Sequence, residues 1–283
     1  MSTVRVACCQ LATNVEDPEE SAARTRAAIA EAVAGGAQIV VVPELSNSGY
    51  MFRAEEEALA AAVSADDPLL AGWAAEAAGG DAVVIGGFCE LGMDGRVYNS
   101  LALVDPDGVQ AVYRKLHLWN EENRWFVPGD QPAPVIDTRH GRIGLGICHD
   151  IDFPELPRGL ALGGADLLAF PVNWPAGDPV PGGRPILHSL ATTTAYLSKV
   201  FVAVCDRCGV ERGAEFEGAS VIAGLDGSLV AGPVEDRGEA ILYADCALSE
   251  ARDKRLNGYN DVFADRRADL YARALVEERE PAL

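Results

Sequence analysis

Apolar and β-branched residues are grouped in short runs along the chain, and the runs are separated by polar or amphipathic stretches. The runs at 3–10, 38–43 and 82–89 predict strands, and the second of them is continuously apolar after Gln38, as expected of a strand covered on both faces. The alanine-rich stretch between the first two runs starts with a proline and two acids after Asp17 and stops at Gly35. It therefore predicts a helix with an N-cap and a glycine end.

The middle of the chain predicts helices, then a hairpin, then a long loop. An acidic helical stretch at 54–78 is interrupted near Pro68, and the strands predicted at 97–104 and 109–113 flank a turn at 105–108 (Asp-Pro-Asp-Gly). The loop at 116–129 is long and irregular, yet rich in aromatic residues. Such a loop is more typical of the lining of a site than of a linker.

The second half repeats the alternation of strands and helices. The predicted elements are a strand at 143–147, a sharp turn at Cys148, a helix from about Glu155, a strand at 167–172, a Pro/Gly-rich loop at 173–185, a helix at 186–199, strands at 200–205, 216–223, 228–232 and 239–245, and then a short helix. No change of composition marks a linker, so we expect one α/β domain of mixed sheets covered by helices. The arginine-rich tail at 257–283 has few apolar residues, and we expect it to pack on the domain or on a partner subunit.

Composition and charge exclude several classes of partner. Apolar residues form 49% of the 283 positions, which is typical of a folded globular protein, while the longest apolar runs are too short to cross a bilayer. The first residues lack a basic segment followed by an apolar one, so we expect a cytoplasmic protein. The formal charge of −20 opposes binding to nucleic acid or to anionic membranes.

The cysteines favour free thiols over disulfides or a metal site. Seven cysteines are an odd number, and they are irregularly spaced. Cys205 and Cys208 form a single CxxC without a second pair, and the four histidines do not complete a zinc pattern. We therefore predict no metal.

Three predicted strands end in chemically reactive residues, namely Glu44, Lys115 and Cys148. Each is ambiguous alone, because a cysteine is often a buried structural residue and a carboxylate after a strand is often part of a turn. Strands of α/β folds commonly deliver functional side chains at their carboxyl ends, so the three are expected to be neighbours in space. Together they form a set suited to acyl transfer.

Each of these residues has a role in such a reaction. The Cys148 thiol needs a base to become a thiolate, and Glu44, with a pKa raised by desolvation, can act as that base. Lys115 and a backbone N–H after the cysteine can stabilise the oxyanion. His149 is the competing base, but adjacent residues on an extended segment point in opposite directions. His117 and His188 remain alternative bases for a Cys/His mechanism.

The motifs around these residues resemble those of the nitrilase superfamily of carbon–nitrogen hydrolases, whose catalytic set is Glu, Lys and Cys in that order. They read VVVPE up to Glu44, YRKLHL around Lys115 and GICHDIDFPE around Cys148, followed by NWP. The resemblance runs from the first strand to about residue 250, and it implies a hydrolase domain at 1–256. It also implies an αββα sandwich that dimerises to αββααββα.

The resemblance implies a second glutamate in the loop after the lysine, before an aromatic-Pro-Gly sequence. In EENRWFVPG this position matches Glu122, with Glu121 as the other register. The carboxylate would orient Lys115 and help position the substrate amide or the hydrolytic water. The alternative is a solvated loop acid.

The residues after the cysteine indicate a branch of the family. Nitrilases usually have Trp-Glu there, whereas His149-Asp150 is closer to the Cys-x-Asp of amidases and carbamoylases. The sequence thus predicts an amidase that converts small aliphatic or carboxylate-bearing primary amides to acid and ammonia through a cysteine thioester, without a cofactor. The alternatives are an N-carbamoyl amidohydrolase and, less favoured, a nitrilase.

Further residues are expected around the substrate. The predicted wall of the pocket consists of Tyr50, Trp119, Asn173 and Trp174, and His149 is expected to contribute its backbone N–H. A carbamoylase for amino-acid substrates would need a cationic clamp, for which Arg184, Arg207 and Arg212 are candidates.

Two non-hydrolase classes are disfavoured. A binding module that had lost activity would be expected to lack one of the three reactive residues. A nucleotide-binding protein would have a glycine-rich loop after the first strand, where residues 11–14 read Leu-Ala-Thr-Asn.

Overall fold

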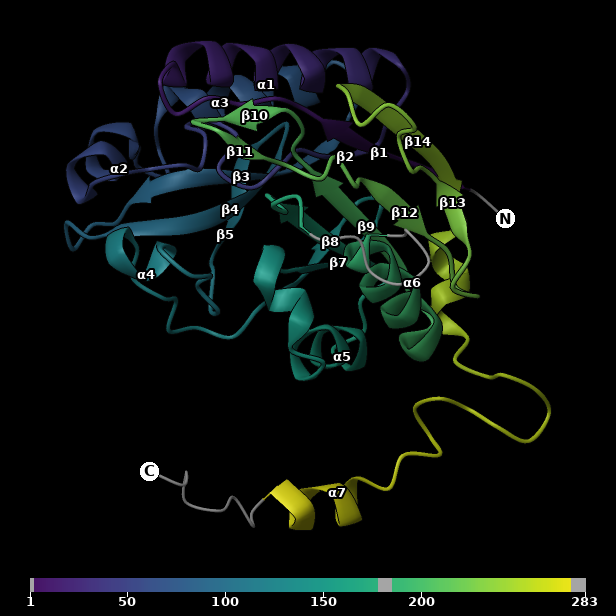
Figure 1. Ribbon diagram of the computed structural model, residues 1–283. Coiled ribbons are helices and arrows are strands. Elements are labelled where there is room, and N and C mark those ends of the chain that lie inside the picture. The colour runs from purple at the N-terminus through teal and green to yellow at the C-terminus, as the bar shows by residue number, and fades with distance from the viewer. Residues whose placement is uncertain (1–2, 178–184, 276–283) are drawn as a thin grey trace.

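Two mixed sheets lie face to face and carry helices on their outer faces. The computed structural model describes residues 3–177 and 185–275, and Figure 1 shows the layers. In sheet order, the first sheet consists of β14 (Ala240–Cys246), β1 (Val4–Gln10), β2 (Ile39–Val41), β3 (Val83–Leu91), β4 (Val97–Asp105) and β5 (Gly108–Arg114). The second consists of β13 (Leu229–Ala231), β12 (Val221–Ala223), β9 (Phe201–Asp206), β8 (Leu167–Val172), β7 (Gly141–Leu145) and β6 (Val135–Thr138).

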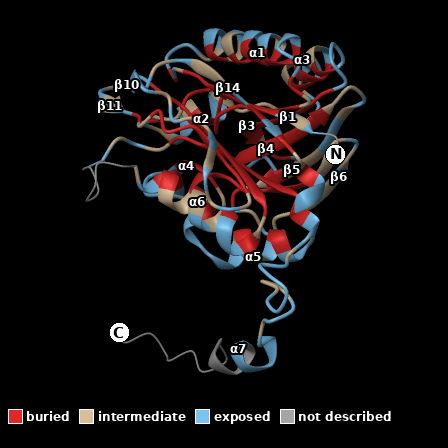
Figure 2. Cartoon of the chain, turned by 90° about the vertical axis from the view of Figure 1, so that its right-hand side faces the viewer, coloured by how far each residue is buried: buried red, intermediate tan, exposed pale blue. Residues whose placement is uncertain are grey.

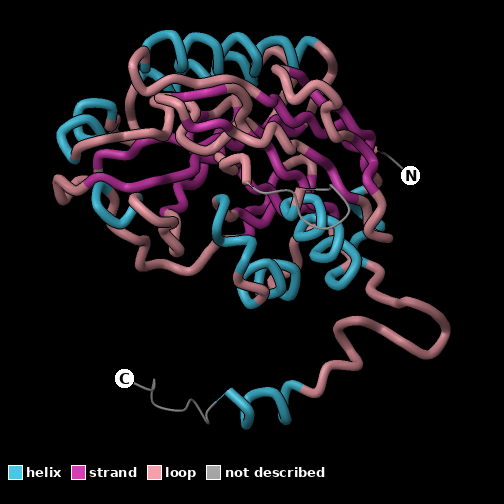
Figure 3. Tube along the Cα trace, in the orientation of Figure 1, coloured by secondary structure: helices cyan, strands magenta, loops and turns pink. Residues whose placement is uncertain are grey.

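The helices cover the sheets in two groups. The helices are α1 (Pro18–Ala34), α2 (Glu55–Ala61), α3 (Pro68–Ala77), α4 (Glu122–Trp125), α5 (Glu155–Leu162), α6 (Ile186–Ser198) and α7 (Ala268–Leu275), with 3₁₀ turns η1 (Cys148–Asp152) and η2 (Leu248–Arg252). Figure 3 shows α1 and α3 over the first sheet and α5 and α6 over the second. The expected αββα architecture is therefore confirmed, whereas dimerisation stays a prediction.

The continuous apolar strands reflect burial on both faces. In β1, Val6 and Cys8 belong to the core between the sheets, while Ala7 and Cys9 face the core under α1 and α3. This alternation follows from the two-residue period of a strand. Figure 2 shows the buried strands enclosed between partly exposed helices.

Strand direction determines where β2 and β5 end. β2 and β3 are parallel, β3 and β4 are antiparallel, and β4 and β5 are antiparallel. Two reversals restore the original direction, so β5 runs the same way as β2. The carboxyl ends of β2 and β5 therefore lie at the same edge of the sheet. Glu44 is the third residue after β2, and Lys115 follows β5 directly.

Several predicted boundaries were wrong. The strand predicted at 216–223 is limited to β12, because Glu217 and Gly218 bond their N–H groups to the loop and turn residues Trp174 and Arg207. The strand β6 and the two-residue strands β10 (Val210–Glu211) and β11 (Ala214–Glu215) were not predicted, because they are short and not strongly apolar. The sharp turn at Cys148 and the helix from Glu155 were predicted correctly, and the turn is the 3₁₀ element η1.

The described part of the tail lies partly against the domain and partly apart from it. Arg158 donates to the Val262 carbonyl at 2.5 Å, and both Arg158 and Lys254 lie over the ring of Phe263. Beyond this segment, α7 stands away from the sheets (Figure 1). Packing of the tail on a partner subunit stays a prediction. Within the described ranges, no helix combines the length and apolar character needed to cross a membrane.

Candidate active site

Glu44, Lys115 and Glu122 form a buried cluster at the shared edge of β2 and β5. Lys115 Nζ donates to Glu44 Oε1 at 2.7 Å and to the two carboxylate oxygens of Glu122 at 2.8 and 2.9 Å. All three side chains are buried. A Cβ at Gly87 on β3 would overlap the backbone of Glu44, so a glycine there allows the Glu44 segment to lie against the strand.

The carboxyl group of Glu44 is prepared for proton transfer. Burial raises its pKa to about 7, against the lowering effect of Lys115. Asn99 Nδ2 on β4 donates to Glu44 Oε1 at 2.7 Å, whereas Glu44 Oε2 has no hydrogen-bond partner among the described residues. A carboxyl with a near-neutral pKa and a free oxygen is suited to accept and return a proton.

Lys115 keeps its positive charge despite complete burial. Burial opposes the charge, but Glu122 and Glu44 outweigh it and raise the pKa of the lysine. A permanently charged ammonium in a site without bulk water is a strong stabiliser of a developing oxyanion.

Cys148 is the first residue of η1 and lies in a strained turn after β7. Its φ of 43° is in the left-handed region, which is uncommon for a residue with a Cβ. Asp150 holds this turn, because its carboxylate accepts from the Ile147 N–H at 2.9 Å and from the Tyr113 hydroxyl at 2.8 Å. Asp150 also lies 2.7 Å from Nδ1 of His117 and thereby links the turn to the loop after β5.

The Cys148 thiol is protonated at rest. Burial and the charge of Glu44 raise its pKa well above the ordinary value, while Lys115 lowers it. The cysteine therefore needs a base at the moment of attack, and the carboxylate whose charge acts on it most strongly is Glu44.

A cavity of about 360 Å³ opens at Cys148. Its lining consists of Trp119, Cys148, His149, Asp152, Asn173, Trp174, Pro175, Ala176 and Gly177. Both polar side-chain atoms of the buried Asn173 lack a hydrogen-bond partner among the described residues. An amide with both groups unsatisfied beside a thiol is available to a bound ligand.

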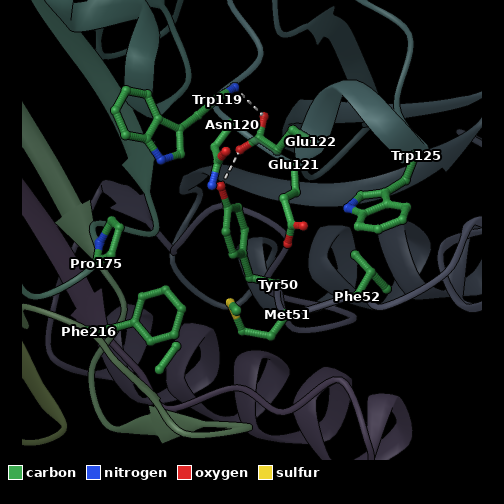
Figure 4. A pocket seen from close by; sticks show the side chains of 11 residues that line it. Tyr50, Met51, Phe52, Trp119, Asn120, Glu121, Glu122, Trp125, Pro175 and Phe216 are labelled. Atoms are coloured by element: carbon green, nitrogen blue, oxygen red, sulfur yellow. Dashed lines mark hydrogen bonds between the residues drawn. The ribbon is translucent and has the colours of Figure 1, made fainter.

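A smaller cavity of about 160 Å³ adjoins this one and shares Trp119 and Pro175 with it. Figure 4 shows Tyr50 and Glu122 meeting at its wall, where the tyrosine hydroxyl donates to Glu122 Oε1 at 2.5 Å. Glu121 instead pairs with Arg124 at the surface. The structure thus places Glu122, and not Glu121, against Lys115.

The remaining sequence candidates are distributed as follows. Trp119, His149, Asn173 and Trp174 line the cavity with Cys148, and Tyr50 lines the adjoining one. The ring nitrogens of the candidate histidine bases lie against other groups: His117 against Asp150, His149 against Asp152, and His188 against the Ala219 carbonyl.

The arginines considered for a substrate clamp are used elsewhere. Arg207 is buried in an ion pair with Glu211, and Arg212 pairs with Glu57. Arg184 lies outside the described residues. Neither Arg207 nor Arg212 is among the described residues that line the cavity at Cys148.

Sequence reasoning missed two residues near the cluster. Asn99 is a buried amide inside the apolar strand β4, and this polar interruption of an apolar run was the available signal. Asp150 was interpreted as part of the Cys-x-Asp signature and was not expected to contact other segments. It does hold the turn, but its contacts with Tyr113 and His117 join residues far apart in the sequence and leave no local pattern.

Comparison with known proteins places the chain in a family. Residues 5–256 match the carbon-nitrogen hydrolase family. A nitrilase from Pyrococcus abyssi is 36% identical, over 95% of this chain and all of the relative, and an N-carbamoylputrescine amidase from Arabidopsis thaliana is 31% identical, over 96% and 93%. A mutant of the amidase from Nesterenkonia sp. AN1 with the acetamide moiety of fluoroacetamide on its active-site cysteine has a TM-score of 0.79 and 26% identity, over 96% of this chain and 97% of that one. The chain therefore belongs to the carbon–nitrogen hydrolases of the nitrilase superfamily.

Proposed function

We propose that this hydrolase is an amidase that converts small aliphatic or carboxylate-bearing primary amides to carboxylic acid and ammonia through a thioester on Cys148. One observation carries the proposal. The buried thiol lines a cavity beside a base with a near-neutral pKa, Glu44, and a permanent cation, Lys115. These are the groups that nucleophilic acyl transfer requires.

The first half of the reaction forms the thioester. Cys148 Sγ attacks the carbonyl carbon of the amide while Glu44 takes the thiol proton. The carbonyl oxygen becomes an oxyanion facing Lys115 and the backbone N–H of His149. The C–N bond then breaks, and Glu44 returns the proton to the leaving nitrogen so that ammonia departs.

The second half releases the acid. Glu44 takes a proton from water, and the resulting hydroxide attacks the thioester carbon. The C–S bond breaks, the carboxylic acid leaves, and the proton on Glu44 restores the thiol. Glu122 keeps Lys115 oriented during both halves through its bonds to Nζ.

The cavity supports a small and largely apolar acyl group. Trp119, Trp174 and Pro175 supply apolar walls, and the unsatisfied amide of Asn173 supplies a hydrogen-bonding group. The Nesterenkonia amidase that carries an acetamide moiety supports the same substrate size. No arginine or lysine is found among the described residues lining the cavity, so we favour uncharged aliphatic amides over carboxylate-bearing ones.

An N-carbamoyl amine is the second candidate substrate. The carboxylate of Asp152 lines the cavity, and it suits an amine end of a substrate better than a carboxylate end. The relative from Arabidopsis thaliana is named an N-carbamoylputrescine amidase, which supports this alternative. Nitriles are the third candidate because of the relative from Pyrococcus abyssi.

An ammonia-release assay separates these candidates. Purified protein is offered propionamide, propionitrile and N-carbamoylpropylamine at equal concentrations. We expect the amide to be hydrolysed with the highest kcat/KM. Preference for the carbamoyl compound or the nitrile would reassign the substrate class.

The same assay tests the nucleophile. Cys148→Ala should release no ammonia, and Cys205→Ala, which removes another buried thiol, is the matched control and should remain active. Mass spectrometry of acid-quenched enzyme should detect an acyl group on Cys148. Retained turnover in Cys148→Ala would refute the mechanism.

A further inference from the structure

A second buried ion pair lies behind the smaller cavity. Arg207 follows β9, Glu211 lies in β10, and Arg207 Nη1 donates to Glu211 Oε2 at 2.8 Å. Arg207 also donates to the Thr13 carbonyl, and its guanidinium lies 3.9 Å from the ring centroid of Phe216. Both charged side chains are completely buried, so the pair needs a structural or functional reason.

Glu211 is the acceptor around which the loop after Glu44 is folded. Its carboxylate accepts from the backbone N–H groups of Val15 at 2.6 Å, Tyr50 at 3.0 Å and Met51 at 2.8 Å. Gly49 has a φ of 77°, and a Cβ there would overlap the Glu211 carboxylate. The loop thus follows the shape of this carboxylate closely, with no space for a side chain at Gly49.

The loop carries the effect of Glu211 to the catalytic cluster through Tyr50. The backbone of Tyr50 bonds to Glu211, and its hydroxyl bonds to Glu122 Oε1 at 2.5 Å. Figure 4 shows the tyrosine ring between Phe216 and Glu122, and the Phe216 and Tyr50 rings meet edge to face with centroids 6.0 Å apart. A hydrogen bond from Tyr50 holds one oxygen of the carboxylate that also binds Lys115.

We propose that Glu211, held by Arg207, is a positioning residue of the reaction, acting through Tyr50 on Glu122 and Lys115; this inference rests on the proposed function. Tyr50 occupies part of the hydrogen-bonding capacity of Glu122. Both oxygens of Glu122 also accept from Lys115 Nζ, so without the bond from Tyr50 the carboxylate and the ammonium that it holds would move from the position that faces the oxyanion. Glu211 fixes the position of the Tyr50 backbone and therefore determines whether the Tyr50 hydroxyl can bond to Glu122.

The experiment is a double-mutant cycle. Tyr50→Phe removes only the hydroxyl, and Glu211→Gln keeps the shape but removes the negative charge that accepts the backbone N–H groups. The two single variants and the double variant are compared with wild type. Glu57→Gln is the matched control, because Glu57 pairs with Arg212 on the same side of the loop but at the surface.

Two readouts are measured for each variant. The first is kcat and KM for the best substrate of the ammonia assay. The second is the rate at which iodoacetamide alkylates Cys148, followed by mass spectrometry from pH 5 to 9. In this reaction the sulfur–carbon bond forms, iodide leaves and the thiol proton passes to Glu44. The second readout needs no turnover.

We expect each single variant to lower kcat about tenfold or more, the effect of one hydrogen bond to a charged group, with KM changed less. The kcat of the double variant should be no lower than that of the less active single variant, because both changes break the same chain of contacts. The pH profile of alkylation should change in both single variants, whereas Glu57→Gln should match wild type in both readouts. Additive losses, or normal kcat in Tyr50→Phe, would overturn the proposal.

The two readouts distinguish this inference from the proposed function. If wild type hydrolyses none of the substrates but the pH profile of the Cys148 alkylation rate changes in both single variants, the proposed function fails and the positioning role stands. If turnover is normal in wild type and the variants alike, only the positioning role fails. If thermal melting shows that Glu211→Gln does not fold, Tyr50→Phe and Gly49→Ala decide, and normal kcat and alkylation in both would overturn it.

Discussion

The described part of the chain has two fully buried ion-pair clusters, and they differ in what surrounds the charges. In the Lys115 cluster, Oε2 of Glu44 and the side-chain oxygen of Asn99 have no hydrogen-bond partner among the described residues, and the charge of Glu44 acts on Cys148, which lines the larger cavity. In the Arg207 cluster, both oxygens of Glu211 accept hydrogen bonds from backbone N–H groups or from Arg207.

The difference indicates two uses of the same residue types. A buried carboxylate whose two oxygens both accept hydrogen bonds, as in Glu211, fixes the backbone around it, at the cost of desolvation. Buried charges with free acceptors are incomplete until a ligand arrives, which is how catalytic groups are prepared for a transition state. Substitutions in the Arg207 cluster should therefore affect stability first, and those in the Lys115 cluster should affect activity first.

The largest expected effect is on stability. Arg207→Met leaves the carboxylate of Glu211 buried without its cation, and we expect the free energy of unfolding to fall by about 3 to 5 kcal/mol. Equilibrium unfolding in urea measures this. Arg24→Met, which breaks an exposed pair with Glu239, is the control and should change stability little. Equal losses in the two variants would remove the distinction between the clusters.

Lys115→Arg tests the catalytic cluster with the charge preserved. The planar guanidinium does not fit a buried position where a compact ammonium has three acceptor oxygens within 2.9 Å. We expect kcat to fall about a hundredfold to a thousandfold, as for loss of an oxyanion donor. Steady-state kinetics checks this, and near-normal kcat would remove Lys115 from the oxyanion site.

Asn99→Ala should shift the pH dependence. As a base, Glu44 must be deprotonated, so kcat/KM should fall as the pH drops through about 7. The hydrogen bond from Asn99 lowers the pKa of Glu44, and its removal should move the midpoint about one pH unit higher. A pH–rate profile measures the midpoint. An unchanged midpoint would argue that another group titrates.

The last prediction concerns the pH dependence of stability in Glu44→Gln. The folded protein raises the pKa of Glu44 from 4.5 to about 7, so the stability linked to its protonation is present below pH 4.5 and is lost as the pH rises through 7. The glutamine variant keeps this stability, because its side chain stays uncharged at every pH. Well above pH 7 we expect the variant to be inactive yet more stable than wild type by up to about 3 kcal/mol, and at pH 4 this advantage should disappear. Thermal melts across this range provide the test.

Much of the fold could be predicted because its signals are local. The apolar strands and the capped helix α1 follow from short windows of sequence, and Asp17 does accept from the N–H of Glu20 as the cap pattern predicts. The reactive ends of β2, β5 and β7 were also visible, since each follows a run of apolar residues. Their mutual distances were not visible, because they depend on the order and direction of strands.

The contacts that sequence reasoning missed are all between distant segments. Tyr50 contacts Glu211 and Glu122, which are 161 and 72 residues away along the chain. Arg207 was considered as a clamp for substrate because arginines suit carboxylates, but it meets the carboxylate of Glu211 instead. Residue type indicates what a group can bind, whereas only the fold determines which partner reaches it.

The path from β3 through β4 to β5 limits how this fold can change. Lys115 reaches the edge where Glu44 lies because the chain reverses direction twice between β3 and β5. One additional antiparallel strand in this meander would reverse the direction of the last strand and carry the lysine to the opposite edge of the sheet. A whole hairpin inserted at the turn 105–108 would keep the direction of the last strand, although it would move the lysine outward by two strand positions, about 10 Å. Only insertions that stay outside the sheet, as loops, leave the site intact.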